Sequence, residues 1–180
     1  MTGGARDEVT LPEIVIADYD PAWPVAFERE RDAIVAALGE AMGGVVAIEH
    51  IGSTSVPGLA AKPIIDIAIG VRQVADGVPC ITPIVQLGYE CRGEFGIPGR
   101  LYFRKGKPRS HHIHMVVHEG EFWRDHTGFR DVLRARPDLA GEYARLKREL
   151  AAHYGGDRAG YTEAKTPFIE SALARARRGA

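Results

Sequence analysis

The sequence predicts a single α/β domain, in which a mixed sheet is followed by a helical C-terminal region. Two short apolar runs, Val45–Ile51 and Ile64–Val71, are rich in β-branched residues and are bounded by glycine or proline, as buried strands usually are. From Glu121 onward, apolar residues recur at helical spacing instead. The chain has 180 residues without a repeat or a shift in composition, so one domain accounts for it.

The N-terminal segment is expected to be a flexible tail over residues 1–13, and the domain is expected to cover residues 14–180. The start of the tail has no apolar stretch like that of a signal peptide. Ile14–Ala17 is expected to be a short edge strand. Asp20 and Pro21 predict the start of a helix, as its N-cap and its first residue. The expected apolar face of this helix consists of Val25, Phe27, Ile34 and Leu38.

The segment after the second strand is predicted to contain one more helix and two more strands. Cys80–Leu87 has the pattern of a helix that stops at Gly88. Leu101–Arg104 and His111–His118 are predicted to pair as antiparallel strands across the basic turn Lys105–Ser110. These strands complete the expected sheet.

Three helices are expected in the C-terminal region. The first ends where Arg136-Pro137 breaks the helical pattern, because proline lacks the amide hydrogen that a helix needs. The second begins at Asp138, and the last runs from about Thr162 to Ala176. The apolar faces of the first two helices consist of Phe122, His126, Phe129 and Leu133, then Leu139, Tyr143, Leu146 and Leu150.

The composition is typical of a soluble globular protein, with 45% hydrophobic and 26% charged residues. The net charge of −1 gives no overall basic field, so nucleic acid is not an expected partner. No apolar run approaches the ~20 residues that span a bilayer, so no membrane is expected either. Cys80 and Cys91 lack the spacing of a metal or redox motif, which favours a reduced, cytoplasmic protein.

The loop between the first two predicted strands places small polar groups close to a charge. Gly52 allows a tight turn, and Ser53, Thr54 and Ser55 offer hydroxyl groups beside loop amides that can face an anion. Asp66 then lies in the middle of the apolar run IIDIAI, where an unpaired charge is costly to bury. We therefore expect Asp66 to face a cleft, a metal or a cationic partner. A polar turn with one hydrogen-bonded aspartate is the structural alternative.

Two histidines are candidates to join this aspartate. His112 and His114 are two residues apart on a predicted strand, so both side chains point to one face. With Asp66 on a neighbouring strand they would form a two-histidine, one-carboxylate set that favours zinc, manganese or iron over magnesium. Glu49 is expected to add a further oxygen. The alternative is that both histidines only make hydrogen bonds in a polar groove.

Four cationic side chains are candidates for binding an anionic ligand. Lys62 follows the loop directly, and Arg100 and Arg104 flank a predicted strand. Lys165 lies four residues after Tyr161, on the same face of the last predicted helix, and Tyr161 is expected to line the ligand pocket with it. Arg100 is expected to be the best anion clamp, because its planar fork donates paired hydrogen bonds to phosphate or carboxylate. Surface solvation is the alternative for Lys165.

Two other features are expected to be structural. Arg130 and Asp131 are expected to form an ion pair that ties a C-terminal helix to the sheet. Trp23 and Trp123 are expected to pack in the interior rather than to stack on a ligand.

Several stretches, in chain order, carry a resemblance to a known family. They are IVIADYDPAWPVAFERE, GSTSVPGLAAKPIIDI, IPGRLYFRKG, HIHMVV, FRDVLRARPDLAGEYARLKRELA and YTEAKTPFI. Through them the chain resembles the GrpB family, the UPF0157-type branch of the nucleotidyltransferase superfamily, whose domain also occurs fused to dephospho-CoA kinase. The resemblance implies a nucleotidyltransferase-like sheet with flanking helices.

The resemblance also implies where the site lies. In this superfamily a Gly-Ser turn holds a nucleotide triphosphate, and two carboxylates spaced Asp-x-Asp on the next strand bind magnesium. Gly52-Ser53 and Asp66 match this pattern, but Ala68 stands where the second carboxylate would be. A single carboxylate is a weak magnesium site.

The leading functional hypothesis is a nucleotidyltransferase that acts on a nucleotide triphosphate and a small acceptor, with magnesium, manganese or zinc as the divalent metal cofactor. Asp66 would hold the metal, Ser53 and the loop amides would hold the phosphates, and Lys62 or Arg100 would stabilise the developing charge. A non-catalytic nucleotide- or CoA-binding accessory module is a second hypothesis, since Ala68 replaces a carboxylate. A metal-dependent hydrolase built on the aspartate and the two histidines is a third.

Overall fold

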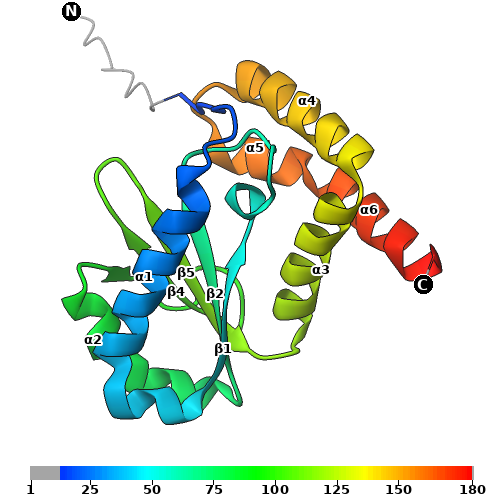
Figure 1. Ribbon diagram of the computed structural model, residues 1–180. Helices are drawn as coiled ribbons and strands as arrows, with labels where there is room; N and C mark the ends of the chain where they lie inside the picture. The colour runs from blue at the N-terminus through cyan, green and yellow to red at the C-terminus, as the bar shows by residue number, and fades with distance from the viewer. Residues whose placement is uncertain (1–12, 180) are drawn as a thin grey trace, which may run out of the picture.

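The computed structural model describes residues 13–179 and contains a five-stranded mixed sheet with helices on both faces (Figure 1). The strand order is β1-β2-β5-β4-β3, in which β2 and β5 are parallel and all other neighbours are antiparallel. The strands are β1 (Val45–Ile51), β2 (Ile65–Val71), β3 (Glu90–Cys91), β4 (Leu101–Lys105) and β5 (His111–Val117). The expected tail over residues 1–13 lies outside the described residues, except for its last residue.

The helices form two groups. Helices α1 (Ala22–Leu38) and α2 (Ile81–Gln86) pack on one face of the sheet, and α3 (Glu121–Ala135) packs on the other (Figure 1). The remaining helices continue from α3 and pack around the loop that follows β1; they are α4 (Pro137–Tyr154), α5 (Arg158–Ala164) and α6 (Thr166–Gly179). Short 3-10 turns cover Gly39–Gly44, Ser53–Ser55 and Val74–Cys80.

Strand β2 has two faces of different character, because side chains alternate along a strand. Ile65, Ile67 and Ile69 are buried in the main core with residues of α1 and α2. Asp66 and Ala68 lie on the opposite face, which α3 covers. The charge of Asp66 is therefore outside the main apolar core, although the run IIDIAI surrounds it in the sequence.

Helix α3 approaches this face closely because β2 carries small residues there. A Cβ added to Gly70 would lie 2.9 Å from the ring of Trp123. Ala68 is 0% exposed and packs in a cluster with Ile51, Val116 and Trp123. The position at which the superfamily pattern has its second carboxylate is thus a packing position against α3.

A second apolar cluster fixes the loop after β1 to the C-terminal helices. Val56 and Leu59 of the loop are buried against Leu133, Leu139 and Tyr143 of α3 and α4. The loop is therefore held by helices as well as by the strands at its two ends, which gives its polar residues fixed positions.

Most predicted elements are confirmed. Strand β1, the antiparallel pair of β4 and β5, and the helix break at Pro137 are present where the sequence predicts them. Trp23 and Trp123 are buried, at 7% and 5% exposure, as packing residues should be. The two-residue strand β3 is not among the predictions, because so short a segment has no periodicity to detect.

Three expectations are wrong. Ile14–Ala17 contributes only a single bridge, to Ala61, instead of an edge strand. Val25 is 49% exposed, because it lies on the side of α1 opposite the buried residues Trp23 and Phe27. The expected last helix is two helices, α5 and α6, because Pro167 cannot continue the hydrogen-bond ladder of α5 and instead occupies the first turn of α6.

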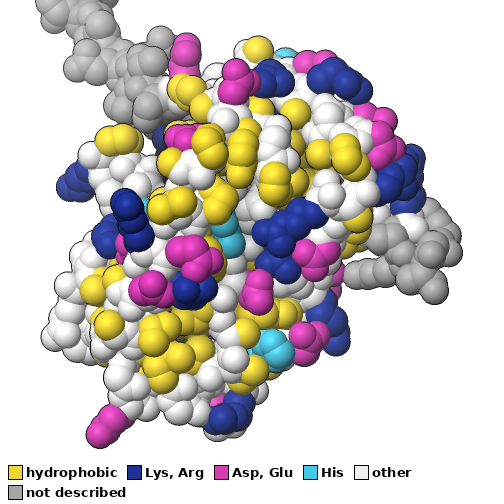
Figure 2. All heavy atoms as spheres, viewed as in Figure 1, with side chains coloured by type: hydrophobic (Ala, Val, Ile, Leu, Met, Phe, Trp, Pro, Cys, Tyr) yellow, Lys and Arg dark blue, Asp and Glu magenta, His cyan; other side chains and the backbone are white. Residues whose placement is uncertain are grey.

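Charged side chains of both signs are interspersed over the face seen in Figure 2, in keeping with the net charge of −1. Across residues 13–179, no helix combines the length and the apolar character that crossing a bilayer requires.

The packing of α3 leads to a prediction about the missing carboxylate. Ala68→Asp restores the second carboxylate of the superfamily pattern, but we expect it to lower the free energy of unfolding by about 3–5 kcal/mol, because the new charge is buried without a partner. Chemical denaturation without added metal measures the change. Val46→Asp, at a position of β1 that is 47% exposed, is the control. Equal stability of the two variants would contradict the close packing of α3 on β2.

Candidate functional site

Asp66, His112 and His114 converge where the parallel strands β2 and β5 meet. The strand register places Asp66 opposite His112 and Ala68 opposite His114, so all three functional side chains share the α3 face. His112 Nδ1 lies 3.1 Å and His114 Nε2 lies 3.5 Å from the same oxygen, Oδ1 of Asp66. One ligand atom from each residue lies within 4.8 Å of the others, a spacing that one metal ion can bridge. The predicted adjacency of these two strands is confirmed.

The imidazoles control the charge of Asp66. Burial alone would raise the pKa of this carboxyl, but hydrogen bonds with His112 and His114 outweigh burial and hold the pKa well below its ordinary value. Burial lowers the pKa of His114, and the nearby carboxylate only partly offsets that effect. Near neutral pH the cluster therefore contains a carboxylate beside a neutral His114.

Gly52 brings the loop backbone against this carboxylate. Its φ of 72° is in the region that favours glycine. A Cβ at this position would lie 2.7 Å from Oδ2 of Asp66. Glycine is therefore needed both for the turn and for the close approach of the loop to Asp66.

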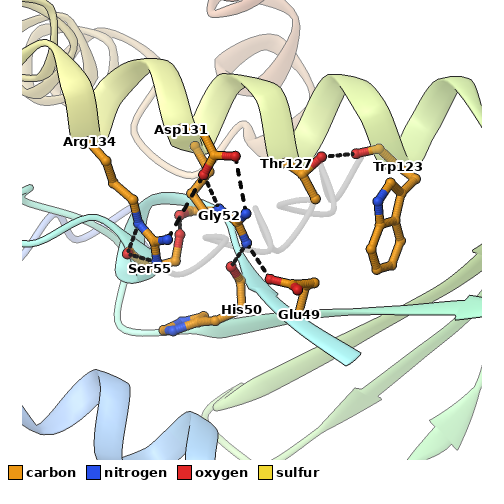
Figure 3. Close-up of polar contacts among 9 residues, drawn as sticks. Glu49, His50, Gly52, Ser55, Trp123, Thr127, Asp131 and Arg134 are labelled. Carbon is orange, nitrogen blue, oxygen red and sulfur yellow. Dashed lines mark hydrogen bonds and ion pairs between the residues drawn. The ribbon is translucent and has the colours of Figure 1, made fainter. Parts of the chain in front are cut away.

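The loop is held in place by hydrogen bonds from within and from α3 (Figure 3). The carbonyl oxygen of Ser55 accepts two bonds, of 2.8 and 3.1 Å, from the guanidinium of Arg134, and the Ser55 hydroxyl donates to a loop carbonyl. Thr54 Oγ1 donates to the carbonyl of Ile64 at 3.1 Å and lies 3.0 Å from His50 Nε2. Both hydroxyls, predicted to bind a ligand, are buried and engaged within the protein.

Three lysines surround a small pocket beside Asp66, which we name the lysine pocket. Lys147 Nζ donates to Ser53 Oγ at 2.9 Å and to a backbone carbonyl of the loop. The Nζ atoms of Lys62 and Lys165 lie 4.3 and 4.4 Å from the centroid of the Tyr161 ring. The pocket has a volume of about 80 Å³. Its polar walls are Ser53, Thr54, Asp66, His112, Tyr161 and the three lysines.

The lysine pocket holds more positive than negative charge. Within residues 13–179, its lysines contact hydroxyl, carbonyl and ring groups but form no ion pair with a carboxylate. Burial, with a smaller contribution from neighbouring cations, lowers the pKa of Lys147 to about 7 and that of Lys165 to about 8, and Asp66 only partly offsets this effect on Lys165. Burial also lowers the pKa of Lys62. An anion that enters this pocket would favour the protonated form of each lysine.

A larger cavity of about 310 Å³ lies on the other side of Asp66, between the loop, α3 and α6. Ser53, Asp66 and Lys165 line both this cavity and the lysine pocket, so the two hollows meet at Asp66. The apolar walls of the larger cavity are Phe129, Leu133, Tyr143 and Ile169.

Glu49, predicted as an additional metal ligand, is paired elsewhere. Its carboxylate lies 2.8 Å from Arg130 Nη1, which also donates to the carbonyl of His50 at 3.0 Å. Arg130 Nε lies 2.8 Å from Asp131. Figure 3 shows Glu49 and His50 on β1, facing Asp131 on α3. The expected tie between a C-terminal helix and the sheet is confirmed, and it keeps Glu49 out of the cluster around Asp66.

Arg100, predicted to clamp an anion, is only 6% exposed and lines neither hollow. Its guanidinium donates to the carbonyl oxygens of Glu94 and Phe95, and Nη1 lies 3.4 Å from His114 Nδ1. These partners occupy the planar fork that was expected to bind phosphate. Arg104 is instead paired with Glu90, at 2.8 Å.

Lys147 is absent from the predicted site residues, although the sequence contains a signal for it. It follows Leu139 and Tyr143 at intervals of four residues, so it belongs to the apolar face of α4. A lysine on such a face is either exposed at its tip or held by buried acceptors. Lys147 is 2% exposed, so its ammonium group is held by buried acceptors.

The Gly-Ser loop follows β1, and the carboxylate of Asp66 lies on the neighbouring strand β2 of the mixed sheet. The family model described as GrpB protein matches residues 13–175, and the chain therefore belongs to the GrpB family.

Known relatives agree with this assignment. The UPF0157 protein YqkA of Bacillus subtilis is 40% identical over 167 residues, which are 92% of this chain but only 47% of YqkA, so the chain spans about half of that relative. The glutamate-rich protein GrpB of Alkalihalophilus pseudofirmus is 32% identical over 171 residues, which are 92% of this chain and 97% of that protein. The crystal structure of the conserved protein GrpB from Enterococcus faecalis matches with a TM-score of 0.81 and 38% identity, over 92% of this chain and 98% of that one.

The lowered pKa values lead to a prediction for stability. Between about pH 7 and about pH 10, Lys147 is largely neutral in the folded protein and protonated in the unfolded chain, so the unfolded state binds more protons and the free energy of unfolding rises with pH. Lys165 adds to this slope above about pH 8. Urea unfolding across this range measures the slope. Lys147→Met should reduce it, and Lys107→Met, at an exposed turn, should leave it unchanged. The same slope in both variants would contradict a buried Lys147 with a lowered pKa.

Proposed function

We propose that this protein binds a nucleotide, with its phosphates in the lysine pocket and a divalent metal ion at Asp66, and that it transfers the nucleotidyl group to a small acceptor. The observation that carries the proposal is the convergence of Lys62, Lys147 and Lys165 on a pocket whose other wall is Asp66. Among residues 13–179 none of the three lysines forms an ion pair with a carboxylate. Three mutually repelling cations destabilise a fold unless an anion joins them, and such conflicts are expected at functional sites.

The charges fit phosphate groups better than a single carboxylate. A triphosphate carries several negative charges and many acceptor oxygens, which match three ammonium groups and the hydroxyl of Ser53. Lys147 already donates to Ser53 Oγ, so lysine and hydroxyl are positioned as one donor set. The organic part of the ligand would occupy the larger cavity, where Phe129 and Tyr143 supply aromatic walls.

The side chains present are suited to one divalent ion and lack the two carboxylates of the superfamily pattern. Asp66 offers the carboxylate, His112 and His114 lie within ligand distance, and Ala68 removes the second carboxylate. A divalent ion held there by Asp66 would neutralise part of the charge of the phosphate groups.

The proposed transfer follows from this placement. A hydroxyl oxygen of the acceptor attacks the phosphorus next to the nucleoside and releases its proton to solvent. The bond from that phosphorus to the bridging oxygen breaks, and pyrophosphate leaves with the bonding electrons. The lysines stabilise the charge that develops on pyrophosphate, and Lys62 and Lys165 are the two that flank Tyr161. The fixed loop at Gly52 holds the reacting group against Asp66.

Nucleotide binding is the first test. The four common nucleoside triphosphates and CoA, each with magnesium or manganese, are added to the protein while its Tm is measured. A ligand at about 100 times its Kd should add about 2.7 kcal/mol to the free energy of unfolding. Lys147→Met and Lys165→Met should reduce this gain, and the exposed control Lys107→Met should keep it.

Turnover is the second test. Pyrophosphate release is followed for each nucleotide that raises the Tm, with a pool of small hydroxyl and amine compounds as acceptors. Metal-dependent release supports transfer. Binding that does not depend on metal and gives no release would instead identify an accessory binding module. A Tm that no triphosphate raises would contradict the proposal as a whole.

A further inference from the structure

Arg100 is a buried cation with an unusual neighbour. It is 6% exposed, and its Nη2 atom donates to the carbonyl oxygens of Glu94 and Phe95 at 3.2 and 2.9 Å. Its guanidinium carbon lies 4.8 Å from the ring centroid of Tyr102, a cation–π contact. The remaining edge of the guanidinium faces His114, with Nη1 3.4 Å from Nδ1. The positive charge is thus fixed beside one of the two histidines of the cluster.

This contact determines which nitrogen of His114 carries the proton. A guanidinium has donors only, so the Nδ1 atom that faces it must accept. A neutral imidazole has one N–H group, which must then be on Nε2. Nε2 lies 3.5 Å from Oδ1 of Asp66, where it can donate to the carboxylate. A nitrogen that carries a hydrogen has no free lone pair for a metal.

Histidines that bind metals have the opposite arrangement. Their second nitrogen normally donates its N–H to a carboxylate or a carbonyl, which leaves the ligating nitrogen free and more basic. His114 faces a donor instead, and that donor is a cation that also repels a metal ion at short range. The three residues have the spacing of a metal site, but Arg100 opposes ligation by His114.

We propose that Arg100 is a specificity-determining residue that keeps His114 a hydrogen-bond donor to Asp66 and so excludes zinc-type ligation at this cluster. Asp66 is then left to share a hard ion, magnesium or manganese, with the oxygens of a bound phosphate ligand. This inference deepens the proposed function and rests on it for the phosphate oxygens that complete the coordination.

Zinc binding without any phosphate ligand tests the role of Arg100, so its result does not depend on whether a nucleotide binds. Isothermal titration with zinc is compared for the wild type, Arg100→Met and Arg124→Met, which removes an exposed arginine from α3. Arg100→Met should bind zinc at least about tenfold more tightly than the wild type, the size of effect that partners of metal ligands commonly have. Arg124→Met should match the wild type. Adding His114→Ala to Arg100→Met should abolish the gain.

Two results would overturn the inference. One is tight zinc binding by the wild type that Arg100→Met does not improve. The other is a gain that persists without His114. Because Arg100 also holds a loop, Arg100→Met requires a check of its folding by circular dichroism, and a second measurement uses the wild type alone. Nitrogen-15 NMR of the His114 ring should show an unprotonated Nδ1 and a protonated Nε2, and the reverse tautomer would refute the proposal.

Discussion

The parallel pairing of β2 with β5 is the constraint on which both the core and the candidate site depend. Its register places Ile67 beside Ile113 in the main core and Asp66 beside His112 on the α3 face. A shift by one residue would exchange the two faces of β2 and bury Asp66 among the isoleucines. The apolar core therefore fixes the positions of the polar groups, and no separate interaction is needed to bring the aspartate and the histidines together.

The electrostatics of the site divide into two parts that meet at Asp66. On one side, the imidazoles of His112 and His114 lie against the carboxylate, and Arg100 lies against His114. On the other side, three lysines share a pocket of about 80 Å³ with few acceptors of their own. The apolar clusters that hold α3 and α4 against the loop offset the destabilising repulsion among these lysines. In the proposed function, a phosphate ligand relieves their repulsion.

The elements and the central cluster could be predicted because their signals are local. The β-branched runs mark β1 and β2, and the two-residue spacing of His112 and His114 places both on one face. The roles of the cations could not be predicted in this way. Lys147 donates to Ser53, which is 94 residues away in the chain, so only the packing of α4 on the loop shows the contact. Arg100 has the chemistry of an anion clamp, but nearby carbonyl groups, which no sequence pattern marks, occupy its fork.

The most direct test of the lysine pocket as a phosphate site is the number of protons taken up when a nucleoside triphosphate binds. Calorimetric titrations near pH 8, in buffers of different ionisation enthalpy, give this number. Lys147 and Lys165, with pKa values lowered to about 7 and about 8, are partly neutral in the free protein. The account predicts net proton uptake that falls when Lys147 and Lys165 are both replaced by methionine. Binding without proton uptake, or equal uptake by the doubly substituted protein, would contradict it.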